Sequence, residues 1–333
     1  MGQVVVISTG GTIASRWQGS GFAADARGGD VLATAAVPAG VTVRVVDLMS
    51  VNSARLTTRD QLALLQTVHE VLADPAVDGI VVTHGTDTLE ESAFLLDLHH
   101  DDARPVVLTG AQLPLEAPDG DGPRNLHDAL LAASSAALRG HGVLVAFDGR
   151  IHAARGTIKV QTLAADAFAD PSGSPVADVK DGHVLVRRQP DRPQPLPLPA
   201  AGTPLPRVDI VTHHCDADPL LFNAAVDAGA RGIVLVATGA GNATPEVVAA
   251  VEAAVARGVL VALTTRVPAG TVAEIYTHGG AVDLAAAGAV LTGTLRAGQA
   301  RIAVLAAALA HPAGATDDGT RALRRALGTP ATS

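Results

Sequence analysis

Short apolar runs rich in β-branched residues recur through the first half of the chain, and stretches rich in Ala and Leu separate them. Unbroken apolar runs are typical of parallel strands that are covered on both faces. The predicted strands are residues 4–7, 41–46, 80–82, 105–108 and 142–145. The predicted helices are residues 58–73, with Thr58 as the N-cap, 87–98 and 125–138. This alternation predicts a mostly parallel sheet with helices on both faces.

A proline-rich segment divides the chain. Residues 189–206 contain seven prolines, and such segments are extended and stiff, so we expect an interdomain linker. Further strands are predicted at residues 208–212, 232–236 and 259–263. The sequence therefore predicts a two-domain α/β fold. Residues 1–188 form a larger N-terminal domain with a mostly parallel sheet and flanking helices, and residues 207–333 form a smaller C-terminal α/β domain.

Composition narrows the class of protein. The chain is 48% hydrophobic and 17% charged, which is typical of a globular protein. Its net charge of −9 disfavours a nucleic-acid partner, and no apolar run approaches the roughly 20 residues of a membrane span. Cys215 is the single cysteine, so no intramolecular disulfide can form, and the first predicted strand leaves no room for a signal peptide. We expect a cytoplasmic enzyme.

Two loops that follow predicted strands combine glycines with threonine hydroxyls. Thr9-Gly10-Gly11-Thr12-Ile13-Ala14 follows the strand at 4–7, and Thr83-His84-Gly85-Thr86-Asp87-Thr88 follows the strand at 80–82. Glycine lets the backbone approach a ligand closely, and ligands of open α/β sheets bind at the carboxyl ends of strands. We therefore expect the two loops to build one shared site around hydroxyl groups.

These two loops resemble the signature motifs of the bacterial-type L-asparaginase family. Further stretches resemble other motifs of that family and follow in order along nearly the whole chain. They are Thr109-Gly110-Ala111-Gln112, Asp121-Gly122-Pro123-Arg124-Asn125-Leu126, Asp148-Gly149-Arg150 and Arg266-Val267-Pro268-Ala269-Gly270. The resemblance implies the asparaginase-like two-domain fold and hydrolysis of L-asparagine to L-aspartate and ammonia, and it allows a glutaminase side activity. It also implies a threonine nucleophile, no metal or cofactor, and a homotetramer built from dimers that share active sites.

The resemblance assigns catalytic roles to several residues of this chain. Thr12 matches the nucleophile, and Thr86, Asp87 and Lys159 match a Thr–Asp–Lys set. The alternative for Thr12 is a helix cap, for Asp87 an acidic first-turn residue, and for Lys159 a surface position. Of 24 basic residues only Lys159 and Lys180 are lysines. Because a desolvated lysine can act as a base and arginine effectively cannot, a lysine at 159 fits a catalytic role.

The resemblance also assigns substrate contacts in the first domain. Gly11 and Gly85 would offer backbone groups, and Asp87 would pair with the substrate's α-ammonium group. Ser53 matches the serine that contacts the substrate carboxylate, with Ser50 as a competing assignment. Ala111 matches the position whose carbonyl lines the oxyanion region.

The second domain adds candidates that a neighbouring subunit would donate. Asn242 and Glu274 match family positions of this kind, although Glu274 equally fits a solvated loop charge. One departure concerns the family's tyrosine after the first motif, because Phe22 occupies that stretch here and its ring has no donor or acceptor. Our hypothesis is that Tyr276, the sole tyrosine, supplies a phenol from an adjacent subunit. Otherwise Lys159 and Thr86 suffice with slow turnover, or the chain has lost its activity.

Rival interpretations rest on other features. The stretches His213-His214-Cys215-Asp216 and His99-His100-Asp101-Asp102 contain metal-ligand types at spacings that match no known site. The dinucleotide fingerprint G-x-G-x-x-G is absent, and His84 is expected to shape the turn. A subunit of a transfer-RNA-dependent amidotransferase would need an added N-terminal domain and a basic surface. A catalytically weak or inactive amino-acid-binding homologue is the remaining alternative.

Overall fold

The computed structural model describes residues 2–200, 202–312 and 314–329. Contacts between Cα atoms divide the chain into two compact units, Met1–Asp191 and Arg192–Ser333. The described residues of the segment 189–206 form neither helix nor strand. Within the second unit, the Arg325 guanidinium donates to the carbonyl oxygens of Gln194 and Pro195, and Leu196 is buried. The start of the second unit is therefore packed against its last helix.

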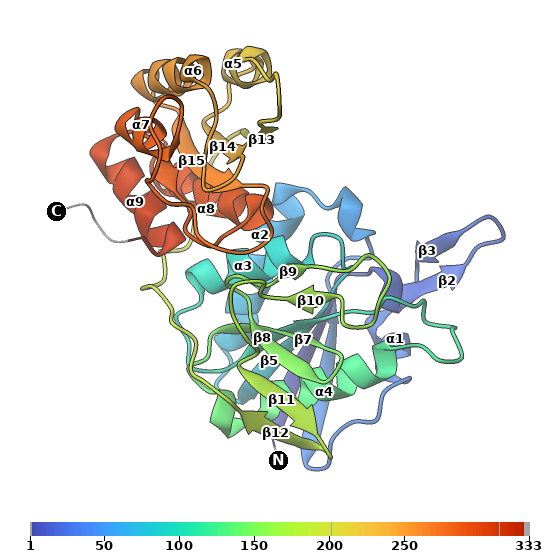
Figure 1. The fold of residues 1–333 in the computed structure, drawn as a ribbon. Coiled ribbons are helices and arrows are strands. Elements are labelled where there is room, and N and C mark those ends of the chain that lie inside the picture. The colour runs from blue at the N-terminus through green and yellow to red at the C-terminus, as the bar shows by residue number, and fades with distance from the viewer. Residues whose placement is uncertain (1, 201, 313, 330–333) are drawn as a thin grey trace. The chain divides into compact units, whose positions relative to one another are not determined.

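The first unit is built on a mixed sheet with the strand order β12-β11-β8-β7-β6-β5-β1-β4 (Figure 1). The parallel strands are β1 (Gly2–Ser8), β4 (Val41–Asp47), β5 (Val77–Thr83), β6 (Val106–Thr109) and β7 (Val143–Phe147). The antiparallel strands are β8 (Arg150–Ala153), β11 (Ala177–Lys180) and β12 (His183–Val186). The predicted mostly parallel sheet is thus confirmed.

Strand β1 lies between β4 and β5, which places a topological switch point at β1 and β5. The chain leaves β1 toward β4 on one side, whereas it leaves β5 toward β6 on the other side. Adjacent strands whose connections diverge leave a crevice outside their carboxyl ends, where ligands of open α/β sheets bind. The loops at residues 9–14 and 83–88, called the two Thr-Gly loops below, follow these two strands.

Helices cover both faces of this sheet because consecutive side chains of a strand point to opposite faces. Val4 and Val6 of β1 pack in the core formed with α1 (Gly28–Leu32) and α4 (Gly122–Ser134). Val5 and Ile7 pack in the core formed with α2 (Thr58–Leu72) and α3 (Leu89–His99). The unbroken apolar run of β1 is therefore explained by burial on both sides.

Several predicted helix boundaries are wrong, including that of α3, which begins at Leu89 rather than at residue 87. Thr57, not Thr58, caps α2: its hydroxyl accepts from the Asp60 amide at 3.3 Å, and the Asp60 carboxylate accepts from the Thr57 amide at 2.8 Å. Helix α4 begins at Gly122 rather than at residue 125, because Pro123 fits the first helical turn. It ends at Ser134, and a separate 3₁₀ turn, η3 (Ala136–Leu138), completes the predicted stretch.

Short elements complete the first unit around the sheet. They are the 3₁₀ turns η1 (Thr12–Ala14) and η2 (Ser53–Arg55), the hairpin β2 (Ser15–Trp17) and β3 (Phe22–Ala24), and the pair β9 (Ile158–Lys159) and β10 (Phe168–Ala169).

The second unit is a smaller α/β layer structure with parallel strands in the order β13-β14-β15-β16. These strands are β13 (Val208–Thr212), β14 (Gly232–Ala237), β15 (Leu260–Thr265) and β16 (Val290–Leu291). One face packs against α5 (Leu220–Asp227), α6 (Pro245–Ala256) and α7 (Ala281–Ala286). Helix α8 (Ala297–Ala310) packs against β13, β14 and β15, and α9 (Asp317–Leu327) packs on α8. The smaller C-terminal α/β fold agrees with the expectation.

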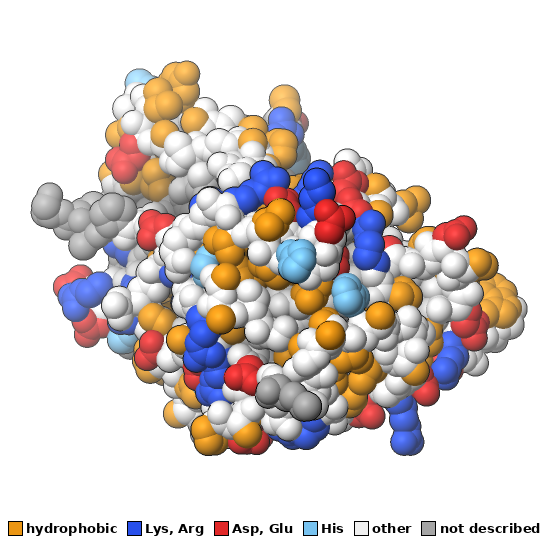
Figure 2. All heavy atoms as spheres, turned by 90° about the horizontal axis from the view of Figure 1, so that it is seen from below, with side chains coloured by type: hydrophobic (Ala, Val, Ile, Leu, Met, Phe, Trp, Pro, Cys, Tyr) orange, Lys and Arg blue, Asp and Glu red, His pale blue; other side chains and the backbone are white. Residues whose placement is uncertain are grey.

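The surface carries both signs of charge. Figure 2 shows basic and acidic side chains intermingled on the face that it draws. None of the helices in the described part of the chain combines the length and the apolar character that crossing a bilayer requires.

Candidate active site

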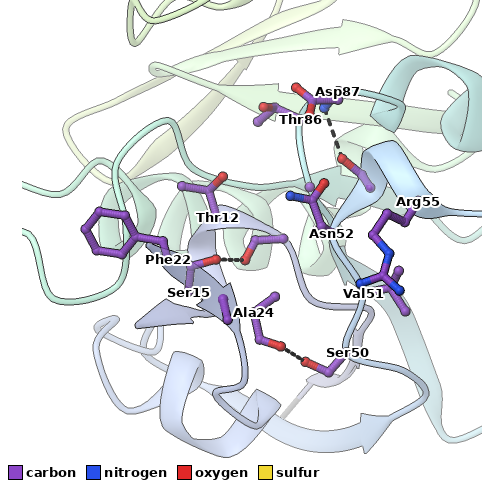
Figure 3. Close-up of a pocket in the computed structure, with 14 residues that line it drawn as sticks. Thr12, Ser15, Phe22, Ala24, Ser50, Val51, Asn52, Arg55, Thr86 and Asp87 are labelled. Carbon is purple, nitrogen blue, oxygen red and sulfur yellow. Dashed lines mark hydrogen bonds between the residues drawn. The ribbon is translucent and has the colours of Figure 1, made fainter. Parts of the chain in front are cut away.

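A cavity of about 400 Å³ lies where the loops after β1 and β5 meet, within the first unit (Figure 3). Its walls come from the two Thr-Gly loops, the hairpin β2–β3 and the segment after β4. The lining residues are Gly11, Thr12, Ser15, Phe22, Ala23, Ala24, Ser50, Val51, Asn52, Ser53, Arg55, Gly85, Thr86 and Asp87. The structure thus brings together the predicted residues Gly11, Thr12, Ser53, Gly85, Thr86 and Asp87.

Two glycines allow these loops to touch backbone to backbone. Gly11 has a φ of +86°, and a Cβ added there would lie 2.3 Å from the Cα of Gly85. A Cβ at Gly85 would lie 2.5 Å from the Oγ of Ser53. No real Cβ tolerates such distances, so glycine at both positions is what permits the three loops to converge on one cavity.

Lys159 joins the second loop from β9. Its Nζ donates to the Oγ1 of Thr86 at 2.8 Å and to the Oδ1 of Asp87 at 2.9 Å. The Lys159 side chain is 19% exposed, whereas that of Asp87 is 54% exposed. The carboxylate of Asp87 therefore holds the ammonium and still faces the solvent of the cavity, where a ligand cation can reach it.

The two candidate serines have different partners. The Oγ of Ser53 accepts from the backbone N–H of Asp87 at 3.2 Å, and the Thr88 hydroxyl donates to the Ser53 carbonyl at 2.9 Å. The hydroxyl of Ser50 donates to the carbonyl oxygen of Ala24 in the hairpin. Both serines line the cavity, but Ser53 is the one that is joined to the Asp87 loop.

Phe22 lines the cavity from the hairpin β2–β3, as Thr12 does from the first loop (Figure 3). Its ring packs edge-on against Trp17, with 5.2 Å between ring centroids, and its side chain remains 55% exposed. The phenyl ring shapes this wall without offering a hydrogen-bonding group.

A buried histidine holds the second loop through two hydrogen bonds. The Nδ1 of His84 lies 2.7 Å from the carbonyl oxygen of Gly85, and its Nε2 lies 3.0 Å from the Oγ of Ser92. Burial lowers the pKa of His84 to about 4, so the imidazole is neutral at pH 7. Because a carbonyl can only accept, Nδ1 carries the proton and Nε2 accepts from Ser92. This arrangement fits the expectation that His84 shapes the turn.

Family models match both parts of the chain. The "Asparaginase, N-terminal" model matches residues 3–192, and the "Glutaminase/Asparaginase C-terminal domain" model matches residues 207–318. The chain belongs to the asparaginase family. The family resemblance inferred from the motifs is thereby confirmed.

Individual relatives agree with this membership. The L-asparaginase of Bacillus licheniformis is 38% identical over 298 residues, which cover 87% of this chain and 90% of that protein. The glutaminase-asparaginase of Pseudomonas fluorescens biotype A is 32% identical over 81% of this chain and 77% of its own length. The crystal structure of the probable cytoplasmic L-asparaginase from Campylobacter jejuni superposes with a TM-score of 0.87 at 29% identity, covering 98% of this chain and 99% of that one.

Other residues assigned from the asparaginase resemblance lie outside the cavity wall. Ala111 is fully buried and is not among the lining residues. Asn242, Glu274 and Tyr276 belong to the second unit. Asn242 forms a backbone bridge with Thr238, and Glu274 and Tyr276 are exposed after β15.

The two histidine-rich stretches do not form a recognisable metal centre. In the described ranges, no group of three or more His, Cys, Asp or Glu side chains is arranged to hold a metal ion. His213, His214 and Asp216 line a separate cavity of about 150 Å³ in the second unit. His99 and His100 are buried at the end of α3.

Sequence reasoning missed several residues of this asparaginase-family cavity. Ser15, Asn52 and Arg55 line it, although none was a candidate. The signal that could have identified Arg55 is its charge, two residues after Ser53 in a loop already assigned to substrate binding. The positive charge of Arg55 is opposite to the negative charge of Asp87, which lines the same cavity.

Proposed function

We propose that this chain is an L-asparaginase, which hydrolyses the side-chain amide of L-asparagine to L-aspartate and ammonia. The observation that carries the proposal is the Lys159 ammonium, which hydrogen-bonds both Thr86 and Asp87 at a cavity that Thr12 also lines. A hydroxyl nucleophile, a second hydroxyl and a paired lysine are the groups that amide hydrolysis through a threonine requires. The names of the L-asparaginase relatives support the same substrate.

The charges of the cavity suit a free amino acid. The half-exposed carboxylate of Asp87 is placed to bind an α-ammonium group. Arg55 and the hydroxyl of Ser53 line the same cavity and are suited to an α-carboxylate. Opposite charges on one cavity match a zwitterion, so the substrate would be held at its α-carbon with its amide free to reach a threonine.

The proposed reaction proceeds in two steps. The Oγ of Thr12 attacks the amide carbon, its proton passes to the departing nitrogen, and ammonia leaves an aspartyl ester on Thr12. A water molecule then attacks the ester carbon, the bond to the Oγ1 of Thr12 breaks, and the Thr86 hydroxyl, held by Lys159, relays a proton from that water to the departing Oγ1. Aspartate leaves and the Thr12 hydroxyl is restored. No step uses a metal or cofactor.

The proposal also includes residues of the second unit, which would contribute to the active site of a neighbouring subunit. We infer that Asn242, Glu274 and Tyr276 act on the site of an adjacent chain in a homotetramer built from dimers. We therefore expect a monomeric variant to be inactive. Size-exclusion chromatography would establish that the variant is monomeric, and an ammonia assay would measure its activity. The relative from Campylobacter jejuni is titled cytoplasmic and one from Haemophilus influenzae periplasmic, and we propose the cytoplasm for this chain.

The first experiment measures ammonia release from L-asparagine and L-glutamine. We expect turnover of asparagine that falls by about a thousandfold or more in Thr12→Ala, Thr86→Ala and Lys159→Met. Lys180→Met is the matched control, because it removes the chain's other lysine, and it should retain full activity. Rapid glutamine turnover would identify a glutaminase-asparaginase, since one methylene changes discrimination by only about 1–3 kcal/mol. Absence of turnover, with aspartate still raising the Tm, would instead identify an amino-acid-binding homologue.

A further inference from the structure

A partly buried carboxylate hydrogen-bonds the backbone of Lys159. Glu90 lies in the first turn of α3, and its Oε2 accepts from the backbone N–H of Lys159 at 2.6 Å. A carboxylate that accepts from a backbone N–H makes a charge-assisted bond, stronger than one between neutral groups. This contact links α3 to β9 across 69 residues of sequence.

The strand that carries Lys159 is short, and hydrogen bonds of the Val160 amide to the Ala167 carbonyl and of the Thr157 hydroxyl to the Ala153 carbonyl flank it. Strand β9 has two residues and pairs only with the two-residue β10, as Lys159 opposite Phe168 and Ile158 opposite Ala169. This pair is a separate sheet and is not part of the main sheet of the first unit. Because this ladder is only two residues long, the bond to Glu90 adds a contact from α3 that fixes where the backbone of Lys159 lies.

Both ends of Lys159 are therefore bound to one short segment, residues 86–90. Its ammonium contacts Thr86 and Asp87, and its backbone N–H contacts Glu90. We propose that Glu90 is a positioning residue, which sets the backbone of Lys159 so that its Nζ reaches Thr86 and Asp87 together. The expected effect of Glu90 on kcat rests on the proposed function, whereas its expected effect on the position of Lys159 rests on geometry alone.

The surroundings of Glu90 leave the hydrogen bond intact near neutral pH. Burial raises the pKa of Glu90 to about 7, the negative charge of Glu91 adds to this rise, and Lys159 opposes it. Both the ionised and the protonated carboxyl group present an acceptor oxygen to the Lys159 amide. A glutamine at this position keeps an acceptor of the same length and loses only the charge.

The test compares Glu90→Leu and Glu90→Gln, with Glu252→Gln as the control at an exposed position on α6. In Glu90→Leu we expect kcat for asparagine to fall about tenfold or more while KM changes little, because the substrate's own contacts remain. Glu90→Gln should restore most of that kcat. Unchanged kcat in Glu90→Leu, or equal losses in both variants, overturns the proposal.

Hydrogen exchange at the Lys159 amide tests the geometry without any catalysis. In Glu90→Leu this amide loses its acceptor and should exchange about tenfold faster or more, whereas Glu90→Gln should protect it. Unchanged protection in Glu90→Leu overturns the positioning role whether or not the parent is active. If the parent releases no ammonia but the amide responds as expected, the proposed function fails and the positioning of Lys159 stands.

Discussion

At the scale of single residues, we expect Tyr276 to affect the rate of the proposed reaction. The ring of Phe22 lines the cavity but has no hydroxyl, and Tyr276 is the only residue of the chain that carries a phenol. If an adjacent subunit's Tyr276 supplies that group, Tyr276→Phe should lower kcat about tenfold or more. Steady-state ammonia release measures this.

A second variant separates this role of Tyr276 from a loss of packing. Adding Phe22→Tyr to Tyr276→Phe should restore part of kcat, because a phenol then returns to the cavity from the chain's own hairpin. Full activity in Tyr276→Phe alone would refute the hypothesis and leave Thr86 and Lys159 as sufficient.

At the scale of elements, the two Thr-Gly loops lie so close together that we expect neither Gly11 nor Gly85 to tolerate replacement by a residue with a side chain. Gly11→Ala and Gly85→Ala each place a Cβ within 2.5 Å of a neighbouring loop, so both should lower kcat by about a hundredfold or more and lower the Tm. Gly19 is the matched control, because its φ is also positive, at +85°, but nothing lies within 4 Å of an added Cβ. Equal effects of Gly19→Ala and Gly11→Ala would show that backbone strain, and not contact between loops, decides the outcome.

The elements also show how far sequence patterns lead. The strands and the two Thr-Gly loops could be predicted because apolar runs and glycine turns are local signals. The position of β1 between β4 and β5 could not, since strand order depends on contacts between distant segments. The prediction of helix ends was wrong where two neighbouring residues can both serve as the N-cap, as with Thr57 and Thr58 at the start of α2.

The candidate site divides in the same way. Thr12, Thr86 and Asp87 lie in motifs with local signals. Lys159 is indicated by the family resemblance and by the scarcity of lysine, and it meets Thr86 across 73 residues of sequence. Arg55 belongs to η2, and its charge beside Ser53 is its only sequence signal; the folded structure shows that it lines the cavity. Local sequence motifs therefore indicated the threonines and Asp87, whereas several other residues that line the cavity are known only from the tertiary structure.

At the scale of the whole molecule, buried histidines should make stability depend on pH. His152 on β8 is buried, and within the described ranges neither of its ring nitrogens has a hydrogen-bond partner. Burial and the positive charges of Arg150 and Arg188 lower its pKa from 6.5 to about 4. The unfolded chain therefore binds the proton more readily, so stability is complete above about pH 6.5 and is lost as pH falls toward 4.

Urea unfolding of the parent and of His152→Leu at pH 7 and pH 5 checks this. The parent should lose about 2 kcal/mol more stability than the variant over this interval, because the variant lacks the titrating group. Replacing the exposed His183 by Leu is the control and should leave the parent's pH dependence unchanged. Parallel losses in the parent and His152→Leu would contradict the assignment.

The scarcity of lysine has a practical consequence for attaching this protein to other materials. Of its two lysine side chains, that of Lys159 is partly buried and hydrogen-bonded at the cavity, whereas Lys180 is exposed at the end of β11. Amine-directed reagents, such as activated polymers or aldehyde supports, therefore meet one open lysine side chain. Coupling through lysine side chains should therefore modify each chain at Lys180 and leave the cavity unmodified.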